Sequence, residues 1–363
     1  MNPSTHTPRS FIHTLPELRC EWSAVIARHG QPAAQEALAK ARLLPGAPMS
    51  LGIGLTAACN FSCPICYYHG SDCNVSEKSC PEMPLAILKH ILQRIGALEQ
   101  VVFATEGEPF LYSGIWDALD LAANAAKSIV LASNGSLIST KEALRLQKYP
   151  IKTIFLSIDG ADGPTYEKFR KGGIFRKFTR ATSLLTESLG QRVIFHAVLC
   201  AQNCTSLLKL PRLARQLGVQ NISLAQIRMH PAAKDRGVTP CSIAALWDFL
   251  DNFLAEAQHN GIGVFFDSHF ADAHTMQRLR LLLGTTKDTL SSELTACPSL
   301  WQHATITQDC SLFPCCGDFQ PVKILHEDFN FDAVFNHEYL LLLRAMMLLG
   351  TVPRGCAACL HLS

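Results

Sequence analysis

Three cysteines close together constrain this chain more than any other feature. Cys59, Cys63 and Cys66 have the spacing C-x3-C-x2-C and directly follow an apolar run over residues 51–55. The run predicts a buried strand that ends in a metal-binding loop. Three thiolates suit a soft metal centre, whereas structural zinc takes four protein ligands. The triplet therefore favours an iron–sulfur cluster with one open iron; a zinc knuckle or a chance grouping of cysteines are the alternatives.

Composition places the chain among globular proteins. Its 363 residues, 48% hydrophobic and 17% charged, are enough for one large domain and a smaller one. A net charge of +2 gives no electrostatic case for nucleic acid. We also expect no membrane partner, because no apolar run reaches the ~18 residues of a span. Residues 1–13 lack a signal-peptide core, so the 15 cysteines indicate metal binding in the cytoplasm rather than a disulfide scaffold.

Strand-like and helix-like segments alternate between residues 51 and 260. Strands are predicted at 51–56, 100–105, 129–132, 153–158, 192–199 and 221–226. Helices are predicted at 83–96, 113–126 with Ser113 as its cap, 140–148, 175–189, 203–217 with a kink at Pro211, and 242–260. Six such repeats predict parallel strands with helices outside. A partial barrel and a doubly wound sheet fit this pattern equally well.

Two regions flank the repeats. Residues 1–50 form an N-terminal helical extension, with two short helices over 15–43 separated at Gly30 and Pro32. Residues 262–296 form a bridge, with an extra strand at 264–266 and a helix at 272–284. The bridge also contains His269 and His274, which are weak functional candidates among 14 histidines. The predicted domains are therefore 1–50, 51–261, 262–296 and 297–363.

Short polar motifs follow three of the predicted strands. The first is Thr-Glu-Gly-Glu-Pro over residues 105–109, the second Ser-Asn-Gly over 133–135, and the third Ser-Ile-Asp-Gly over 157–160. Each alone is consistent with a turn that ends a strand, because Asn-Gly and Asp-Gly favour turns. Their common place after strands, in series with the triplet, favours a functional role for the set.

With Asn60 and Pro64 inside the triplet and Tyr67 after it, the loop resembles the cluster loop of radical S-adenosylmethionine (SAM) enzymes. The resemblance implies a partial (β/α)6 barrel whose three cysteines hold a 4Fe–4S cluster, with SAM on the fourth iron. It also implies an external electron donor such as flavodoxin or ferredoxin. Reductive cleavage of SAM in this family produces a 5′-deoxyadenosyl radical that abstracts hydrogen from a substrate.

The same resemblance extends to the three polar motifs. Thr105, Glu106, Gly107 and Glu108 are similar to the family's T-G-G-E-P segment, whose backbone and glutamate hold the SAM amino group. Glu106 departs from this pattern, which has glycine there.

The other two motifs are similar to T-N-G and S-L-D-G. They imply SAM contacts for Ser133, Asn134, Ser157 and Asp159, with both serines facing the SAM carboxylate or ribose. Arg170 lies where relatives often have an arginine, and it either binds substrate or pairs with a carboxylate.

A second cysteine set lies near the C-terminus. Its members Cys297, Cys315, Cys356 and Cys359 surround a predicted strand at 303–307, a hairpin turn at 308–311 and a helix at 338–349. Four thiolates complete one metal centre, and zinc would accept them. The pattern resembles the Twitch module, the short form of the SPASM extension of radical SAM enzymes, which implies a second 4Fe–4S cluster. The further cluster of a full SPASM form is expected to be absent.

The hairpin turn departs from the family pattern. Relatives usually have Asp-Gly where this chain has Asp309-Cys310. If the position needs a positive φ, a residue other than glycine costs about 1 kcal/mol there. Cys310 and Cys316 are candidates for extra ligands or a hydrogen-atom donor. The alternative is that they are small buried residues.

Three functions are compatible with these features. The leading hypothesis is radical oxidation, epimerisation or dehydration of a small-molecule substrate that is polar and sugar-like or aminocyclitol-like. The alternative is a peptide-modifying maturase, although such enzymes typically carry a winged-helix domain and a full SPASM module, and residues 1–50 are short for that domain. The third is a non-enzymatic metal-binding scaffold, which the series of SAM-like motifs argues against.

Overall fold

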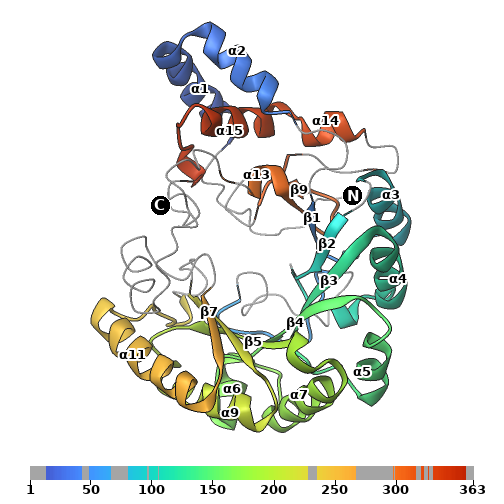
Figure 1. Cartoon of the computed structure of the whole chain (residues 1–363), viewed down its shortest axis with the longest axis vertical. Coiled ribbons are helices and arrows are strands. Elements are labelled where there is room, and N and C mark those ends of the chain that lie inside the picture. Colours follow the sequence, from blue (N-terminus) through green and yellow to red (C-terminus); the bar gives the residue numbers. More distant parts are fainter. Residues whose placement is uncertain are drawn as a thin grey trace. The chain divides into compact units, whose positions relative to one another are not determined.

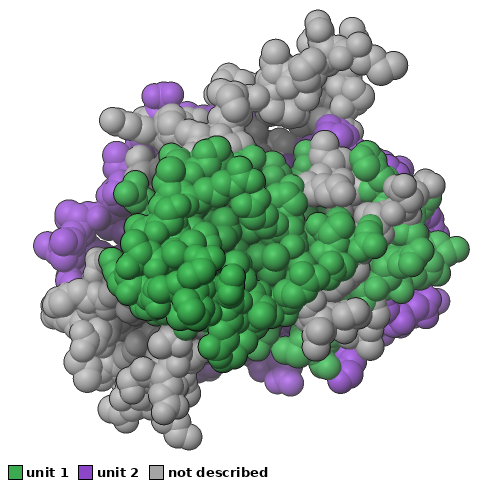
Figure 2. Space-filling view, turned by 90° about the horizontal axis from the view of Figure 1, so that it is seen from above, with its two compact units in different colours: residues 1–52, 86–99, 272–363 green, residues 53–85, 100–271 purple. Residues whose placement is uncertain are grey.

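The computed structural model describes residues 14–42, 49–66, 81–95, 98–104, 106–227, 235–266, 297, 299–315, 320–322, 326 and 330–356. Several predictions fall outside these residues: those for Thr105, His269, His274, Cys316, Cys359 and the helix at 272–284. The chain divides into two compact units (Figure 2). The first comprises residues 1–52, 86–99 and 272–363, and the second comprises 53–85 and 100–271.

The second unit is built on a curved parallel sheet. Its strands lie in the order of the chain: β2 (Leu98–Phe103), β3 (Ala126–Ser133), β4 (Ile151–Ser157), β5 (Val193–Leu199), β6 (Asn221–Gln226) and β7 (Gly263–Phe266). Each neighbouring pair from β3 to β7 is parallel, which confirms the extra strand predicted at 264–266. Parallel strands bring their carboxyl ends to one edge, where sites of such sheets lie.

Helices cover the outer side of this sheet (Figure 1). They are α4 (Ile115–Ala125), α5 (Thr140–Leu146), α6 (Gly163–Phe169), α7 (Phe175–Leu189), α8 (Cys204–Leu207), α9 (Leu210–Gln216) and α11 (Ile243–Asn260). The helix α7 illustrates why they pack there: Phe178, Ala181, Leu185 and Leu189 recur at helical spacing and are buried. Burying one apolar face of each helix against the sheet leaves the strand ends to form a site.

Three local predictions differ from the structure. Ser113 does not cap α4, because its hydroxyl donates to Glu82 Oε2 at 2.7 Å and Gly114 occupies the N-cap position. Pro211 does not kink one long helix; it lies in the first turn of α9, and α8 is a separate short helix. Proline suits a first turn because the amide that it lacks has no partner within the helix. The helix α6 was not predicted.

The first unit contains the predicted N-terminal helices α1 (Leu15–His29) and α2 (Gln31–Lys40), which are separated at Gly30 with φ 84°. They lie against α15 (Glu338–Leu348) (Figure 1). The unit also contains β1 (Ser50–Ile53), α3 (Leu85–Ile95), α13 (Ser299–Gln302), β8 (His303–Ile306), β9 (Leu312–Phe313), α14 (Phe331–Phe335) and the turn η3 (Arg354–Cys356). Strands β8 and β9 pair antiparallel, as predicted for the hairpin.

A buried arginine joins several of these elements. Arg344 of α15 donates from Nε to Leu300 O at 2.8 Å and from Nη1 to Phe335 O at 2.9 Å. Backbone carbonyls satisfy a guanidinium that is 2% exposed, so one side chain holds α13 and the end of α14 against α15. No helix in the described part of the chain is both long and apolar enough to cross a bilayer.

Candidate metal and cofactor site

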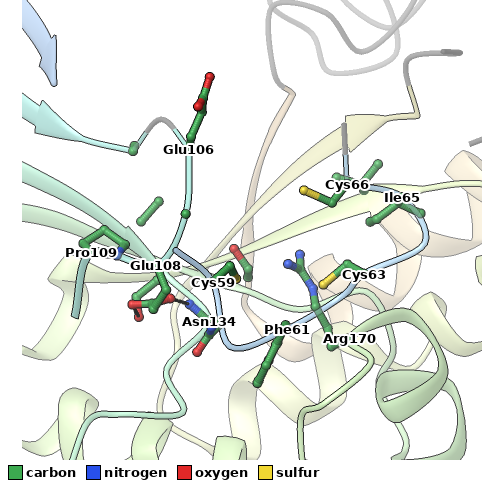
Figure 3. A pocket seen from close by; sticks show the side chains of 16 residues that line it. Cys59, Phe61, Cys63, Ile65, Cys66, Glu106, Glu108, Pro109, Asn134 and Arg170 are labelled. Atoms are coloured by element: carbon green, nitrogen blue, oxygen red, sulfur yellow. Dashed lines mark hydrogen bonds between the residues drawn. The ribbon is translucent and has the colours of Figure 1, made fainter. Parts of the chain in front are cut away.

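The cysteine triplet lines a cavity of about 230 Å³ in the second unit (Figure 3). The predicted cofactor residues that share its wall are Glu106, Gly107, Glu108, Ser133, Asn134 and Ser157, together with Arg170. These residues come from the loop after β1 and from the segments that follow β2, β3 and β4. Residues that are up to 111 positions apart in the sequence thus meet at the strand ends, as the order of the motifs predicted.

Burial disfavours the charged form of two of the three thiols. It raises the pKa of Cys59 to about 12 and that of Cys63 to about 11. A metal centre would displace the thiol protons, because the thiolate is the ligand. Figure 3 shows the sulfur atoms of Cys63 and Cys66 pointing into the cavity.

The donor set suits an iron–sulfur cluster. Three thiols share one cavity wall, and thiolates are the ligands that hold such clusters. Among the described residues, no three His, Cys, Asp or Glu side chains are grouped as ligands of one metal ion.

Glu108 is the buried acidic group of the site. It is 2% exposed, and its carboxylate accepts hydrogen bonds from Ser133 Oγ at 2.8 Å, Asn134 N at 2.7 Å and Phe110 N at 3.3 Å. Burial raises its pKa, and these three donors oppose that rise. A carboxylate held this way, at the cavity wall, is oriented to receive a cationic group such as an ammonium.

Gly107 brings the segment after β2 against the start of the cysteine loop. Its φ is +70°, and a Cβ there would lie 2.2 Å from Thr56 O and 2.6 Å from Ala58 O. The next amide, Glu108 N, donates to Ala58 O at 2.7 Å. Glycine is required here both by the backbone conformation and by the close approach. Glu106, the departure from the family pattern, points away from Glu108 (Figure 3).

We therefore expect Gly107→Ala to destabilise the protein by at least ~2 kcal/mol, because two backbone segments must separate. The matched control is Gly261→Ala, which has a similar φ of +69° and nothing within 4 Å of the added Cβ. That control should cost about 1 kcal/mol from backbone strain alone. Urea unfolding of both variants measures the difference, and equal losses would contradict the close approach.

Two predicted residues form an ion pair. Asp159 has a fully buried side chain and is not part of the cavity wall, unlike Ser157 two residues before it. Its Oδ1 accepts from Val198 N at 2.8 Å, and its Oδ2 lies 2.5 Å from Nε of Arg170. Of the two roles considered for Arg170, pairing with a carboxylate is the one seen here, and its guanidinium also reaches the cavity.

Two further residues at the site were not predicted. Asn60 accepts from Asn134 Nδ2 at 2.8 Å, which ties the cysteine loop to the segment after β3. Arg236 donates from Nη1 to the carbonyl oxygens of Pro64 at 3.1 Å and Cys66 at 3.4 Å. Asn60 was noticed within the triplet without a contact being assigned. Arg236 had no sequence signal, because it lies outside every motif.

Three members of the second cysteine set lie in the first unit. Cys297 and Cys356 are buried and Cys315 is half-buried. Burial raises the pKa of Tyr339, and the nearby thiols of Cys356 and Cys315 add to this effect. The helix α1 contacts the same region: Leu15 N donates to Gln320 Oε1 at 3.3 Å, and Glu21 pairs with Arg354 at 3.3 Å.

Cys310 has the backbone conformation that the hairpin was expected to need. Its φ is 63°, the one positive value among the described residues other than glycine. The side chain is 6% exposed, and burial raises the pKa of its thiol to about 11. A neutral, buried thiol matches the alternative of a small buried residue.

We predict that Cys310→Gly is more stable than Cys310→Ala by up to about 1 kcal/mol, reversing the usual order of these residues. Both variants lose the thiol, so their difference isolates the strain of a β carbon at positive φ. Thermal unfolding of the pair provides the measurement. A more stable alanine variant would show that the turn relaxes without strain.

The comparisons with known proteins agree with this geometry. Residues 53–205 match the family model described as Radical SAM superfamily. The chain therefore carries a radical SAM domain, and its parallel sheet is the partial barrel that the resemblance implied. Members of this superfamily are enzymes, so the scaffold hypothesis is set aside. The superfamily also implies SAM and one 4Fe–4S cluster as cofactors.

Two curated relatives match half of the chain. The AdoMet-dependent heme synthase of Methanosarcina barkeri is 24% identical over 48% of this chain and 49% of its own length. The Mycofactocin maturase MftC of Mycolicibacterium smegmatis is 25% identical over 53% of this chain and 47% of its own length. The chain thus spans about half the length of these relatives.

Two solved structures share the fold over most of the chain. Streptococcus suis SuiB bound to precursor peptide SuiA has a TM-score of 0.60 and 16% identity, over 91% of this chain and 73% of that chain. Native anSMEcpe with bound AdoMet and Cp18Cys peptide has a TM-score of 0.58 and 18% identity, over 80% and 82%. At these identities the likeness concerns the fold.

Proposed function

We propose that this protein is a radical SAM enzyme of the maturase type, which abstracts hydrogen from a polypeptide substrate. The observation that carries the chemistry is the single cavity that brings together the three thiols and the Glu108 network. A bound 4Fe–4S cluster would supply the electron that cleaves SAM. Cys59, Cys63 and Cys66 would hold the cluster beside the strand ends.

The other residues of the cavity would position SAM. The Glu108 carboxylate would accept hydrogen bonds from the SAM ammonium, and Ser133 Oγ and Asn134 N would hold that Glu108 carboxylate in place. Gly107 permits the backbone of its segment to approach the cysteine loop, which brings the ammonium site next to the cluster. Ser157, from the end of β4, would face the SAM carboxylate or ribose. In this proposal Asp159 supports the site through Arg170 instead of contacting SAM.

Named relatives favour a peptide over the sugar-like metabolite that the sequence first suggested. MftC is named a maturase, SuiB is described with a precursor peptide, and anSMEcpe with the Cp18Cys peptide. The name of the heme synthase indicates small-molecule chemistry, so a small molecule is the second candidate substrate.

The remaining assignments belong to the same proposal. Cys297, Cys315, Cys356 and Cys359 would ligate a second 4Fe–4S cluster in a Twitch-like module over residues 297–363, after a barrel over 51–261 and a bridge over 262–296. The four positions belong to one compact unit, and the three that the structure describes are buried or half-buried, which supports this. A flavodoxin or ferredoxin would provide electrons.

Deuterium transfer tests the choice of substrate. Reconstituted, reduced protein is incubated with SAM and either any short peptide encoded near its gene, in deuterated form, or deuterated sugars and aminocyclitols. We expect deuterium in 5′-deoxyadenosine from the peptide alone, because the abstracted atom is retained in that product. Label from a sugar or aminocyclitol, with none from the peptide, would restore the metabolite hypothesis.

A further inference from the structure

Arg170 has a fixed position at the cavity wall. It is the C-cap of α6, its side chain is 13% exposed, and its Nε lies 2.5 Å from Oδ2 of the fully buried Asp159. Burial alone would lower the pKa of Arg170, but Asp159 and the nearby thiols of Cys63 and Cys66 raise it. The guanidinium is therefore a permanent positive charge, anchored at one edge.

The rest of the guanidinium faces the cysteine triplet. Figure 3 shows its terminal nitrogen atoms pointing toward the cavity beside Cys63. Arg170 and Cys63 line the same cavity. A positive charge beside this sulfur favours its thiolate, which is the form that binds iron.

The turn that follows Arg170 is packed directly on the cysteine loop. Ser62 N donates to Lys171 O at 2.9 Å. Gly172 has φ +101°, and a Cβ there would lie 3.0 Å from Asn60 O; a Cβ on Gly173 would lie 3.0 Å from the ring of Phe61. Because the two segments touch along several residues, the backbone of the Arg170 turn is held next to the cysteine loop, and Asp159 anchors the guanidinium itself.

We propose that Arg170 is a positioning residue that raises the reduction potential of the cluster at Cys63, and that Asp159 orients it and partly offsets its charge. Reduction adds one electron, and a neighbouring positive charge stabilises the added negative charge. The inference rests on the proposed cluster at the triplet. It assigns the Asp159–Arg170 pair a role in making SAM cleavage accessible to the electron donor.

A redox titration followed by electron paramagnetic resonance tests this on the reconstituted full chain. Arg170→Gln should shift the reduction equilibrium about tenfold toward the oxidised cluster, ~59 mV for a one-electron couple. Asp159→Asn should shift it in the opposite direction, because it removes a negative charge. The double variant Asp159→Asn/Arg170→Gln should return toward the wild-type potential. If Arg170 and Asp159 only supported the fold, the two single variants would not shift the reduction potential in opposite directions.

Two further variants separate local charge from folding. Arg236→Gln also removes one positive charge, but Arg236 contacts backbone carbonyls of the loop. It should shift the potential less than Arg170→Gln, and an equal shift would overturn the role of Cys63. Arg170→Lys keeps the positive charge, so its reduction potential should stay close to the wild-type value. This variant also provides a measurement if Arg170→Gln fails to fold. A lysine variant that shifts tenfold toward oxidation would overturn the charge argument.

The same titration separates this inference from the proposed function. The relevant signal is the electron paramagnetic resonance signal of the cluster at the triplet. It is identified by its presence in the wild type and its absence from the variant in which Cys59, Cys63 and Cys66 are replaced with alanine. If the wild type shows no such signal, the proposed cluster itself is wrong. If the signal is present and neither Arg170→Gln nor Asp159→Asn moves its potential, only the role of Arg170 is overturned.

Discussion

Replacing Cys59, Cys63 and Cys66 with alanine is expected to reduce SAM cleavage to the rate of the reductant alone. The three thiols line one cavity in the second unit, so their loss removes every proposed ligand of the cluster beside Glu108. Formation of 5′-deoxyadenosine after anaerobic reconstitution and reduction measures the effect. The variant should keep about half of the wild-type iron, because the second cysteine set lies in the other unit.

Cys20→Ala and Cys204→Ala provide the matched controls. Cys20 is exposed on α1 and Cys204 is half-buried at the start of α8, and neither lines the cavity. Both should form 5′-deoxyadenosine at the wild-type rate. Cleavage at the wild-type rate by the triplet variant would refute the assignment of the cluster, whatever the iron content.

Replacing Cys297, Cys315, Cys356 and Cys359 with alanine should lower iron and sulfide from about eight to about four of each per chain. The remaining four belong to the triplet, which these substitutions leave intact. Reductive SAM cleavage without substrate should therefore survive. Elemental analysis after reconstitution gives the count.

Zinc is the alternative occupant of the second set, since it accepts four thiolates. One equivalent of zinc in the wild type, with iron near four per chain, would refute the second cluster. It would leave the first assignment unaffected.

Much of the fold could be predicted because its signals are local. The apolar face of α7 and the separation of α1 from α2 at Gly30 are readable from spacing and from single residues. The Asp-Gly of relatives raised a positive φ at Cys310 as a condition to be tested, and the structure has it. One local error arose at a helix start: Ser113 was expected to cap α4, but the N-cap position is occupied by Gly114, and the Ser113 hydroxyl donates to Glu82.

The candidate site was predictable to the extent that it consists of motifs at strand ends. Residues after β2, β3 and β4 meet the triplet because parallel strands deliver their ends to one edge. The contacts of the individual side chains were not predictable. Asp159 was expected at SAM, but its carboxylate is used by Val198 N and Arg170. Arg236 belongs to no motif, yet it holds the carbonyls of Pro64 and Cys66.

The sequence alone therefore determined the chemistry available to this protein: three soft ligands on one loop, a glutamate after the next strand, and a second cysteine set. Those properties depend on residue type and on position along the chain, which folding does not change. Only the tertiary structure decided which charges act together, because burial and distance set the strength of an electrostatic interaction. The pairing of Arg170 with Asp159 beside Cys63 joins three segments over more than a hundred residues. No periodicity or local propensity records such a contact.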